Sequence, residues 1–125
     1  MPDNALESVV QNAVIRYLRT DDRVAPGMVW RTNVGPLKAK GNPNAFAGWS
    51  VRNVLGKPFK GFPDVSCVLL GGRAAFFECK RKGETLTKDQ EDFEKIAVPS
   101  GAIYAMVTCW EDVDLAFRLH DDDWK

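Results

Sequence analysis

Three charged residues stand at the ends of two apolar segments in the middle of the chain. Asp64 precedes the first segment, and Glu78 and Lys80 close the second. Two carboxylates at one strand end suit Mg²⁺, which prefers oxygen ligands, keeps several waters and often takes only one or two carboxylates. The main-chain carbonyl of Cys79 would supply a further oxygen. Such an ion polarises a phosphate and lowers the pKa of water, and Lys80 would orient that water or stabilise charge in the transition state.

The turn between the two segments decides whether these side chains meet. If Gly71-Gly72-Arg73 is a three-residue loop, Asp64 lies opposite Lys80. Ser66 then lies opposite Glu78. Alternation along a strand puts all three charged side chains on one face of the sheet. A two-residue Gly71-Gly72 loop would turn Asp64 to the other face. We therefore expect the three-residue loop, or a bulge with the same effect.

Each of these residues also has an ordinary explanation. Asp64 follows Pro63, and Pro-Asp is common in turns. Glu78 and Lys80 could be solvent-exposed at a strand end, as an ion pair that contributes little to stability. Taken together, and next to a basic segment, the three residues favour a site.

The charges of the chain are unevenly distributed although the net charge is zero. Between Arg23 and Pro63 there are seven basic residues and no acidic one, whereas residues 111–125 hold six acidic residues against two basic ones. A local basic surface can bind phosphate whatever the total charge. The alternative is an ordinary solvated loop.

Residues 34–62 form a long, irregular, basic loop in which aromatic residues are interleaved. A loop of this length is usually functional or disordered. Basic and aromatic side chains together suit phosphate contact and base stacking. The alternative is that the aromatic residues anchor the loop to the core. Arg31 and Asn33, just before it, either contact a phosphate backbone or anchor the strand edge. Under the family resemblance described below, the candidate DNA contacts are Arg31, Asn33, Lys38, Lys40, Arg52, Lys57, Lys60 and Arg81.

Hydrophobic periodicity predicts a single α/β domain over residues 1–125, with a mixed central sheet flanked by helices. The paired segments around Gly71-Gly72 are apolar on both faces, so we expect them in the centre of the sheet. Residues 120–125 read as an acidic tail. The expected elements, in order, are a helix over 4–18, a strand over 28–33, strands over 65–70 and 74–79, a helix over 87–98, a strand over 103–107 and a helix over 110–119.

Two polar residues near helix starts have two possible roles. Glu7 lies three residues after Asn4, and Gln90 lies three residues after Thr87, so each fits a capping box. The family resemblance described below gives each of them a second possible role, at the charged strand end. A third capping box is expected between Thr108 and Glu111.

Composition excludes several classes of protein. No apolar run approaches the roughly 20 residues that span a bilayer. The first residues lack the pattern of a secretory signal. The three cysteines, Cys67, Cys79 and Cys109, form no CxxC motif and lie in or beside expected strands, so core packing is favoured over zinc or disulfides. These features predict a cytoplasmic protein.

The charged residues, taken with their surroundings, resemble a known family. Pro63-Asp64 followed by Glu78-Cys79-Lys80 is similar to the PD-(D/E)xK nuclease motif. The order of several motifs along the chain resembles the VRR-NUC domain of that superfamily, over roughly residues 6–114. The motifs are Glu7, Trp30-Arg31-Thr32-Asn33-Val34-Gly35, Gly61-Phe62-Pro63-Asp64, Gly71-Gly72, Glu78-Cys79-Lys80-Arg81 and Leu86-Thr87-x-x-Gln90-x-x-Phe93.

The resemblance implies a restriction-endonuclease-like αβββαβ core and Mg²⁺- or Mn²⁺-dependent hydrolysis of DNA phosphodiester bonds. It implies that Asp64 and Glu78 bind metal together with Glu7 and the Cys79 carbonyl, that Lys80 is catalytic, and that Gln90 lies near the site. It also implies an endonuclease that acts on branched DNA such as Holliday junctions, as a homodimer, in a bacterial cytoplasm, with a phage or prophage origin.

Three other functions fit parts of the pattern. A sequence-specific restriction-type nuclease would need an element that reads base edges, and the irregular loop offers no obvious reader. A non-catalytic DNA-binding protein would not need Asp64, Glu78 and Lys80, the three motif positions that are all present in this sequence. An adaptor on a nuclease-like scaffold is supported only by the acidic tail.

Overall fold

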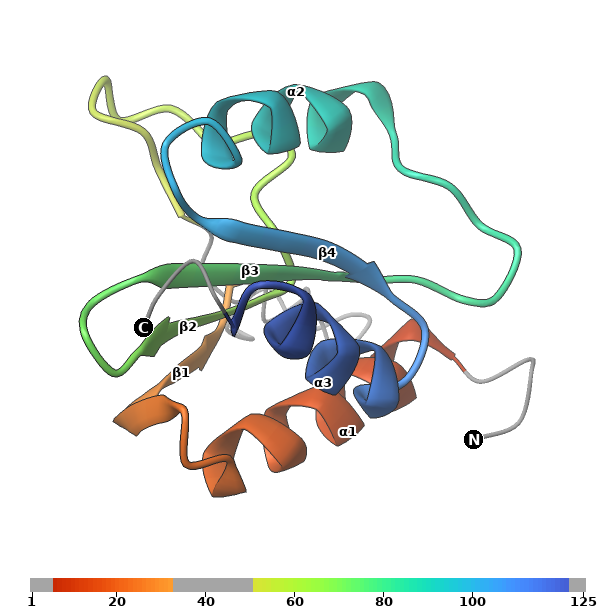
Figure 1. Ribbon diagram of the computed structural model, residues 1–125. Coiled ribbons are helices and arrows are strands. Elements are labelled where there is room, and N and C mark those ends of the chain that lie inside the picture. Colours follow the sequence, from red (N-terminus) through yellow and green to blue (C-terminus); the bar gives the residue numbers. More distant parts are fainter. Residues whose placement is uncertain (1–5, 33–50, 122–125) are drawn as a thin grey trace, which may run out of the picture.

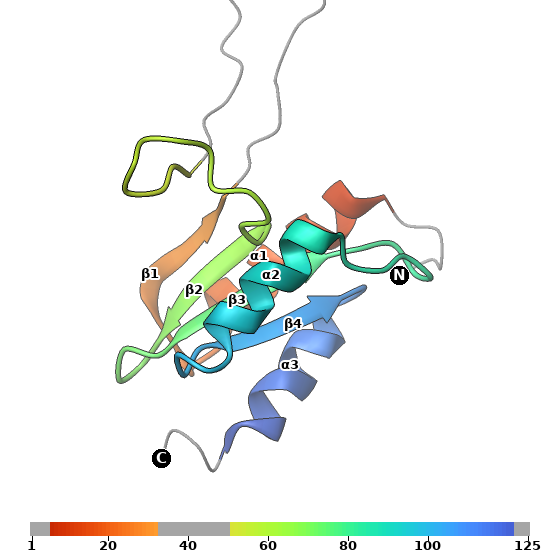
Figure 2. The ribbon, with the colours of Figure 1, turned by 90° about the horizontal axis from the view of Figure 1, so that it is seen from above.

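The computed structural model describes residues 6–32 and 51–121, which form a layered α/β structure. One four-stranded sheet lies between helices, with α1 (Glu7–Thr20) and α3 (Trp110–Leu119) on one face and α2 (Lys88–Ala97) on the other (Figures 1 and 2). The elements follow the order α, β, β, β, α, β, α, which confirms the predicted order. No helix among the described residues is long and apolar enough to cross a membrane.

The sheet is mixed, with strand order β1-β2-β3-β4. Strands β1 (Val24–Arg31), β2 (Val65–Leu69) and β3 (Ala74–Cys79) are antiparallel neighbours, and β4 (Ile103–Val107) runs parallel to β3 after the α2 crossover. The predicted central position of β2 and β3 is confirmed.

Strand β1 starts four residues earlier than the predicted Met28. It includes Pro26 and Gly27, which lie where its register against β2 shifts between Val24 and Val29. Proline and glycine are tolerated in strands at such irregularities and at sheet edges. The strand therefore runs through both residues, whereas it was predicted to start only after them, at Met28.

The helix starts differ in part from the expected capping pairs. Leu6 is the N-cap of α1, without a side-chain cap hydrogen bond, and Glu7 is its first helical residue. Asn4, the predicted partner of Glu7, lies outside the described residues. At the start of α3 the N–H and hydroxyl of Thr108 both donate to Asp112 Oδ2, at 2.9 and 3.2 Å, and Glu111 has no part in the cap. The capping box of Thr87 with Gln90 is present as predicted.

The β2–β3 register differs from the expected one by two positions. Ser66 lies opposite Phe76, not Glu78, and the Leu69 N–H donates to the Arg73 carbonyl at 2.8 Å. The loop is therefore Leu70-Gly71-Gly72, because Arg73 already belongs to the ladder. Gly71 and Gly72 both have positive φ, a backbone conformation that glycine adopts at little steric cost because it has no Cβ. The loop still has three residues, so the alternation of faces is preserved.

Two apolar clusters hold the layers together. Odd-numbered residues of β2 and β3 pack against α1 and α3. The rings of Phe77 and Phe117 meet edge to face, with their centroids 5.7 Å apart. Even-numbered residues face α2, where Phe76 and Tyr104 pack around Phe93. Cys67 and Cys79 belong to the first cluster, and Cys109 is half-buried, in line with packing roles. The strand-end charges lie on the α2 face, which has the smaller cluster.

Candidate active site

Asp64 is fixed by the backbones of both neighbouring strands. Its carbonyl oxygen accepts a hydrogen bond from the Thr32 N–H, just beyond β1, at 2.9 Å. Its Oδ2 accepts one from the Cys79 N–H in β3, also at 2.9 Å. The register of β2 and β3 brings Asp64 opposite Glu78, not opposite Lys80 as expected. The side chain thus bridges to β3 and does more than shape a turn after Pro63.

Glu78 is buried at the end of β3, with 3% of its surface exposed. Gln90 Nε2 donates to its Oε1 at 2.9 Å. Its Oε2 is buried and makes no hydrogen bond within the described structure. An unsatisfied buried carboxylate oxygen is costly and calls for a proton or a cation. Glu78 therefore differs from the exposed strand-end residue that was the ordinary alternative.

Gln90 performs both roles that the sequence left open. Its Oε1 accepts from the Thr87 N–H at 2.9 Å, which completes the capping box of α2. Its Nε2 points the other way, to Glu78. One amide therefore fixes the start of the helix and one oxygen of the buried acid, so the helix start and the strand end cannot move independently.

The environment of Glu78 favours its protonated form. Burial raises the pKa of Glu78 to about 9, the neighbouring carboxyl of Asp64 adds to the rise, and Lys80 opposes it. Glu7 contributes a smaller rise to the same pKa. The Glu78 carboxyl is thus removed from water and lies next to a second carboxyl, an environment in which a proton or a cation stabilises it.

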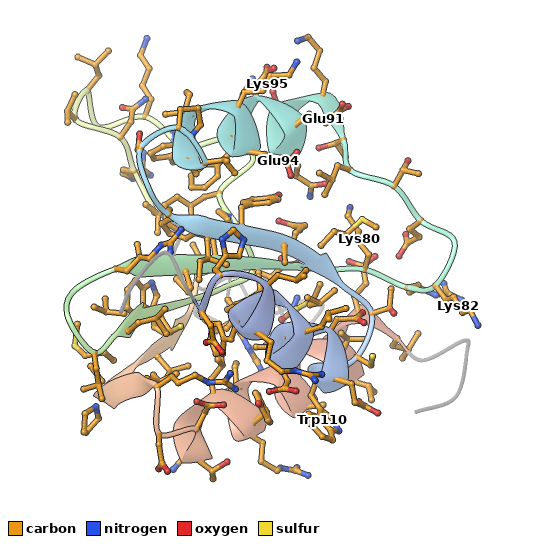
Figure 3. The ribbon with its side chains drawn as sticks, viewed as in Figure 1. Lys80, Lys82, Glu91, Glu94, Lys95 and Trp110 are labelled. Atoms are coloured by element: carbon orange, nitrogen blue, oxygen red, sulfur yellow. The ribbon has the colours of Figure 1, made fainter. Side chains whose placement is uncertain are left out.

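Lys80 is buried with 7% of its surface exposed, and its N–H continues the ladder to Val107 at 2.9 Å. Figure 3 shows it at the end of β3, in the space between the sheet and α2. Its charge lowers the pKa of Glu7 as well as that of Glu78, which places it among the acidic residues. A lysine buried beside carboxylates is a positioned charge, not a solvated one.

Glu7 reaches this end of the sheet from the first turn of α1. Burial raises the pKa of Glu7, and a hydrogen bond with Glu84 adds to the rise. Glu84 lies in the β3–α2 connection, where its Oε1 accepts from the Arg81 N–H at 2.6 Å. Sequence reasoning did not single out Glu84, although it is the first acidic residue after Lys80.

The residues at this strand end fit a hard divalent cation. No group of three or more histidine, cysteine, aspartate or glutamate side chains could hold a metal by itself anywhere in residues 6–32 or 51–121. Asp64 and Glu78 nevertheless provide two adjoining carboxyls with one unpartnered buried oxygen. Mg²⁺ accepts such a pair, with waters or a phosphate completing its coordination. Glu7 lies at the same end, engaged with Glu84.

The predicted DNA contacts divide into groups. Arg31 donates to Asn12 Oδ1 of α1, which supports the alternative of anchoring the strand edge. Arg52 donates to the Gly56 carbonyl at 2.8 Å and remains exposed. The other predicted contacts that are described and exposed are Lys57, Lys60 and Arg81. Asn33, Lys38 and Lys40 lie outside the described residues.

The first residue of the basic stretch is engaged within the fold. Arg23 pairs with Asp21 at 2.7 Å and with Asp114 at 2.8 Å, so its charge is neutralised where α1, β1 and α3 meet. Among the described residues of the basic stretch, the exposed charges are therefore those of residues 51–60, and Arg81 and Lys82 add to them after β3.

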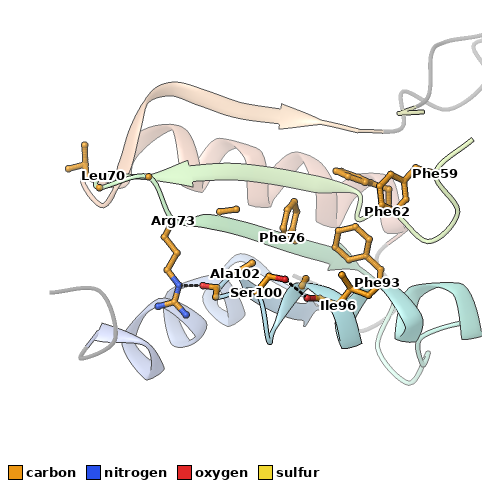
Figure 4. A pocket seen from close by; sticks show the side chains of 14 residues that line it. Phe59, Phe62, Leu70, Arg73, Phe76, Phe93, Ile96, Ser100 and Ala102 are labelled. Atoms are coloured by element: carbon orange, nitrogen blue, oxygen red, sulfur yellow. Dashed lines mark hydrogen bonds between the residues drawn. The ribbon is translucent and has the colours of Figure 1, made fainter. Parts of the chain in front are cut away.

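A hollow of about 900 Å³ lies on the same face of the sheet but at its other end. It is lined by the β2–β3 turn, the end of α2 and aromatic side chains that include Phe76 and Phe93 (Figure 4). Arg73 donates to the Gly101 carbonyl there, at 2.6 Å. Neither Asp64 nor Glu78 lines it, so it is separate from the charged site.

The chain matches no protein-family model, no curated protein and no solved structure.

Proposed function

We propose that this protein is a Mg²⁺-dependent DNA endonuclease of the PD-(D/E)xK kind, similar to the VRR-NUC domain. One observation carries the proposal: Asp64 and the buried Glu78 converge on one face at one strand end, with Lys80 beside them. The element order agrees with the restriction-endonuclease-like core that this reading requires. Mn²⁺ would serve the same ligands.

Each residue of the site has a role that its environment supports. Asp64 and Glu78 would hold the metal, with the Cys79 carbonyl as a further ligand and Glu7 nearby. Bound Mg²⁺ supplies charge neutralisation on the phosphate and activation of water. Lys80, buried and held by the ladder to β4, would orient the water or stabilise charge on the phosphate. Gln90 keeps Glu78 in place.

The preference for branched DNA and the homodimer are parts of the proposal that rest on the family resemblance. Two identical protomers related by a two-fold axis would present two sites to two strands of a junction. The exposed basic residues next to the site supply phosphate contacts for such a substrate.

Cleavage of labelled DNA by the parent and by Lys80→Ala and Asp64→Asn tests the proposal. The substrates are a four-way junction, a flap and a matched linear duplex, each with Mg²⁺ and with EDTA. We expect the parent to cut the branched DNA, and each variant to lose at least about 100-fold in rate, the usual cost of removing a positioned charge.

Lys88→Ala is the matched control for Lys80→Ala. Lys88 is an exposed lysine of α2, paired with Asp92 at 3.3 Å, and its loss should leave cleavage unchanged. If the parent binds DNA and cuts none of the substrates, the protein is a binding protein and the enzyme proposal fails. If Lys80→Ala cuts as fast as the parent, the assignment of the site is wrong. Preferential cutting of the linear duplex at one sequence would favour a restriction-type nuclease.

A further inference from the structure

Residues 51–60, termed the finger below, lie beyond the end of β1 and lead into β2 (Figure 2). Val54 and Leu55 form its tip. Val54 is fully exposed and Leu55 is 76% exposed. Burying such a side chain stabilises a protein by about 1.5–3 kcal/mol. Val54 and Leu55 do not gain this stabilisation, because the fold leaves both of them exposed to solvent. A partner that covers the tip would recover it.

The tip is held in one conformation by hydrogen bonds. The Gly56 N–H donates to the Asn53 carbonyl at 2.9 Å, which closes a four-residue turn with Val54 and Leu55 in the middle. Asn53 Oδ1 accepts from the Leu55 N–H at 2.9 Å and from the Lys57 N–H at 3.2 Å. Asparagine at the first position stabilises such turns through these bonds. The two aliphatic side chains are therefore presented, not simply left in a loose loop.

The base of the finger packs against α2, the helix whose Gln90 contacts Glu78. Phe59 and Phe62 pack against Phe93 with ring centroids 5.6 and 5.1 Å apart (Figure 4). Gly61 lies so close to α2 that an added Cβ would be 2.1 Å from the Asp89 carbonyl oxygen. The tip precedes Asp64 by nine residues, which span at most about 30 Å. The wedge and Asp64 are therefore at most about nine base steps of DNA apart.

The charge around the tip indicates the kind of partner. The finger holds Arg52, Lys57 and Lys60, all exposed, and no acidic residue. A purely apolar protein interface would not need three cations beside two aliphatic residues. DNA satisfies both features, because phosphates accept the cations and an apolar wedge can enter a base step. Unstacking a base costs least where stacking is already interrupted, as it is at a branch point.

We propose that the finger is a DNA wedge: Val54 and Leu55 insert at the branch point and unstack a base, while Lys57 and Lys60 hold the flanking phosphates. This inference rests on the proposed function and deepens it, because it assigns the recognition of branched DNA to a defined element. The finger and Glu78 both contact α2, so insertion sets the position of the scissile phosphate.

The test uses a four-way junction with 2-aminopurine at the branch point, whose fluorescence rises when the base unstacks. Binding is measured in EDTA, so that cleavage does not interfere. We expect the parent to raise the fluorescence several-fold. Val54→Ser/Leu55→Ser should lose most of that rise while its affinity falls less than about tenfold, because insertion roughly balances unstacking. Lys57→Gln/Lys60→Gln should lower the salt slope of binding by about two.

Leu119→Ser is the matched control, since Leu119 is 73% exposed at the end of α3, on the other side of the sheet. It should keep the parent's fluorescence rise. An equal rise for Val54→Ser/Leu55→Ser and the parent overturns the wedge, as does a parent that binds without any rise or does not bind the junction. If the serine pair instead turns a dimer into a monomer in sedimentation, the tip is a protein interface and the wedge is wrong. A parent that raises the fluorescence but cuts no DNA would sink the nuclease proposal alone.

Discussion

The buried carboxyl of Glu78 should make the protein less stable as pH rises. The pKa of Glu78 is raised from 4.5 to about 9 in the folded state, mainly by burial. Between these values the folded protein keeps a proton that the unfolded chain has released, so the stability contributed by this group is present below about pH 4.5 and is lost as pH rises toward 9. Each pH unit in that window lowers the free energy of unfolding by about 1.4 kcal/mol.

Replacing Glu78 with glutamine removes this dependence while keeping the shape of the side chain. The amide oxygen of glutamine can still accept the hydrogen bond from Gln90 Nε2. Over two pH units, from about pH 5 to about pH 7, the parent should lose about 3 kcal/mol of unfolding free energy relative to Glu78→Gln. Urea unfolding at several pH values in EDTA measures both slopes.

Glu91→Gln is the control for this experiment, because Glu91 is an exposed glutamate of α2 (Figure 3). It should follow the parent at every pH. Parallel stability curves for the parent and Glu78→Gln would refute the reasoning, since they would mean that the carboxyl is not desolvated in the folded protein. Adding Mg²⁺ should stabilise the parent most at high pH, where the ion takes the place of the proton, and should stabilise Glu78→Gln little.

Two further predictions concern the contacts that support the site. In urea unfolding, Gly61→Ala should destabilise the protein by about 2 kcal/mol more than Gly27→Ala. Both glycines have φ of 76°, but only Gly61 lies against the Asp89 carbonyl. Equal losses would show that an added Cβ at Gly61 causes no strain against this carbonyl. Thr87→Ala and Gln90→Ala should each cost about 1 kcal/mol as cap mutations, but only Gln90→Ala should also slow Mg²⁺-dependent cleavage, because it frees the buried acid as well. Equal cleavage by both variants would limit Gln90 to capping.

The amino-acid sequence alone predicts the order of helices and strands, because hydrophobic periodicity reports directly which face of each element is buried. It also predicts that Asp64, Glu78 and Lys80 share a face, since that depends only on whether the hairpin loop has an odd or an even number of residues. The start of β1 is not predicted, because Pro26 and Gly27 read as a break and only the pairing with β2 shows that a bulge accommodates them.

Tertiary structure decides what each charged residue does. Asp64 and Glu78 are opposite one another because Arg73 pairs with Leu69 at the start of the β3 ladder. The expected register, shifted by two residues, would keep every side chain on the same face. The local sequence does not distinguish these two registers. The burial of Glu78, and therefore its raised pKa, depends on α2 packing over the strand end through Gln90. Glu84 meets Glu7, and Gly61 meets Asp89, across long separations in the chain. Periodicity describes one element at a time, whereas desolvation and charge coupling arise only when separate elements come together.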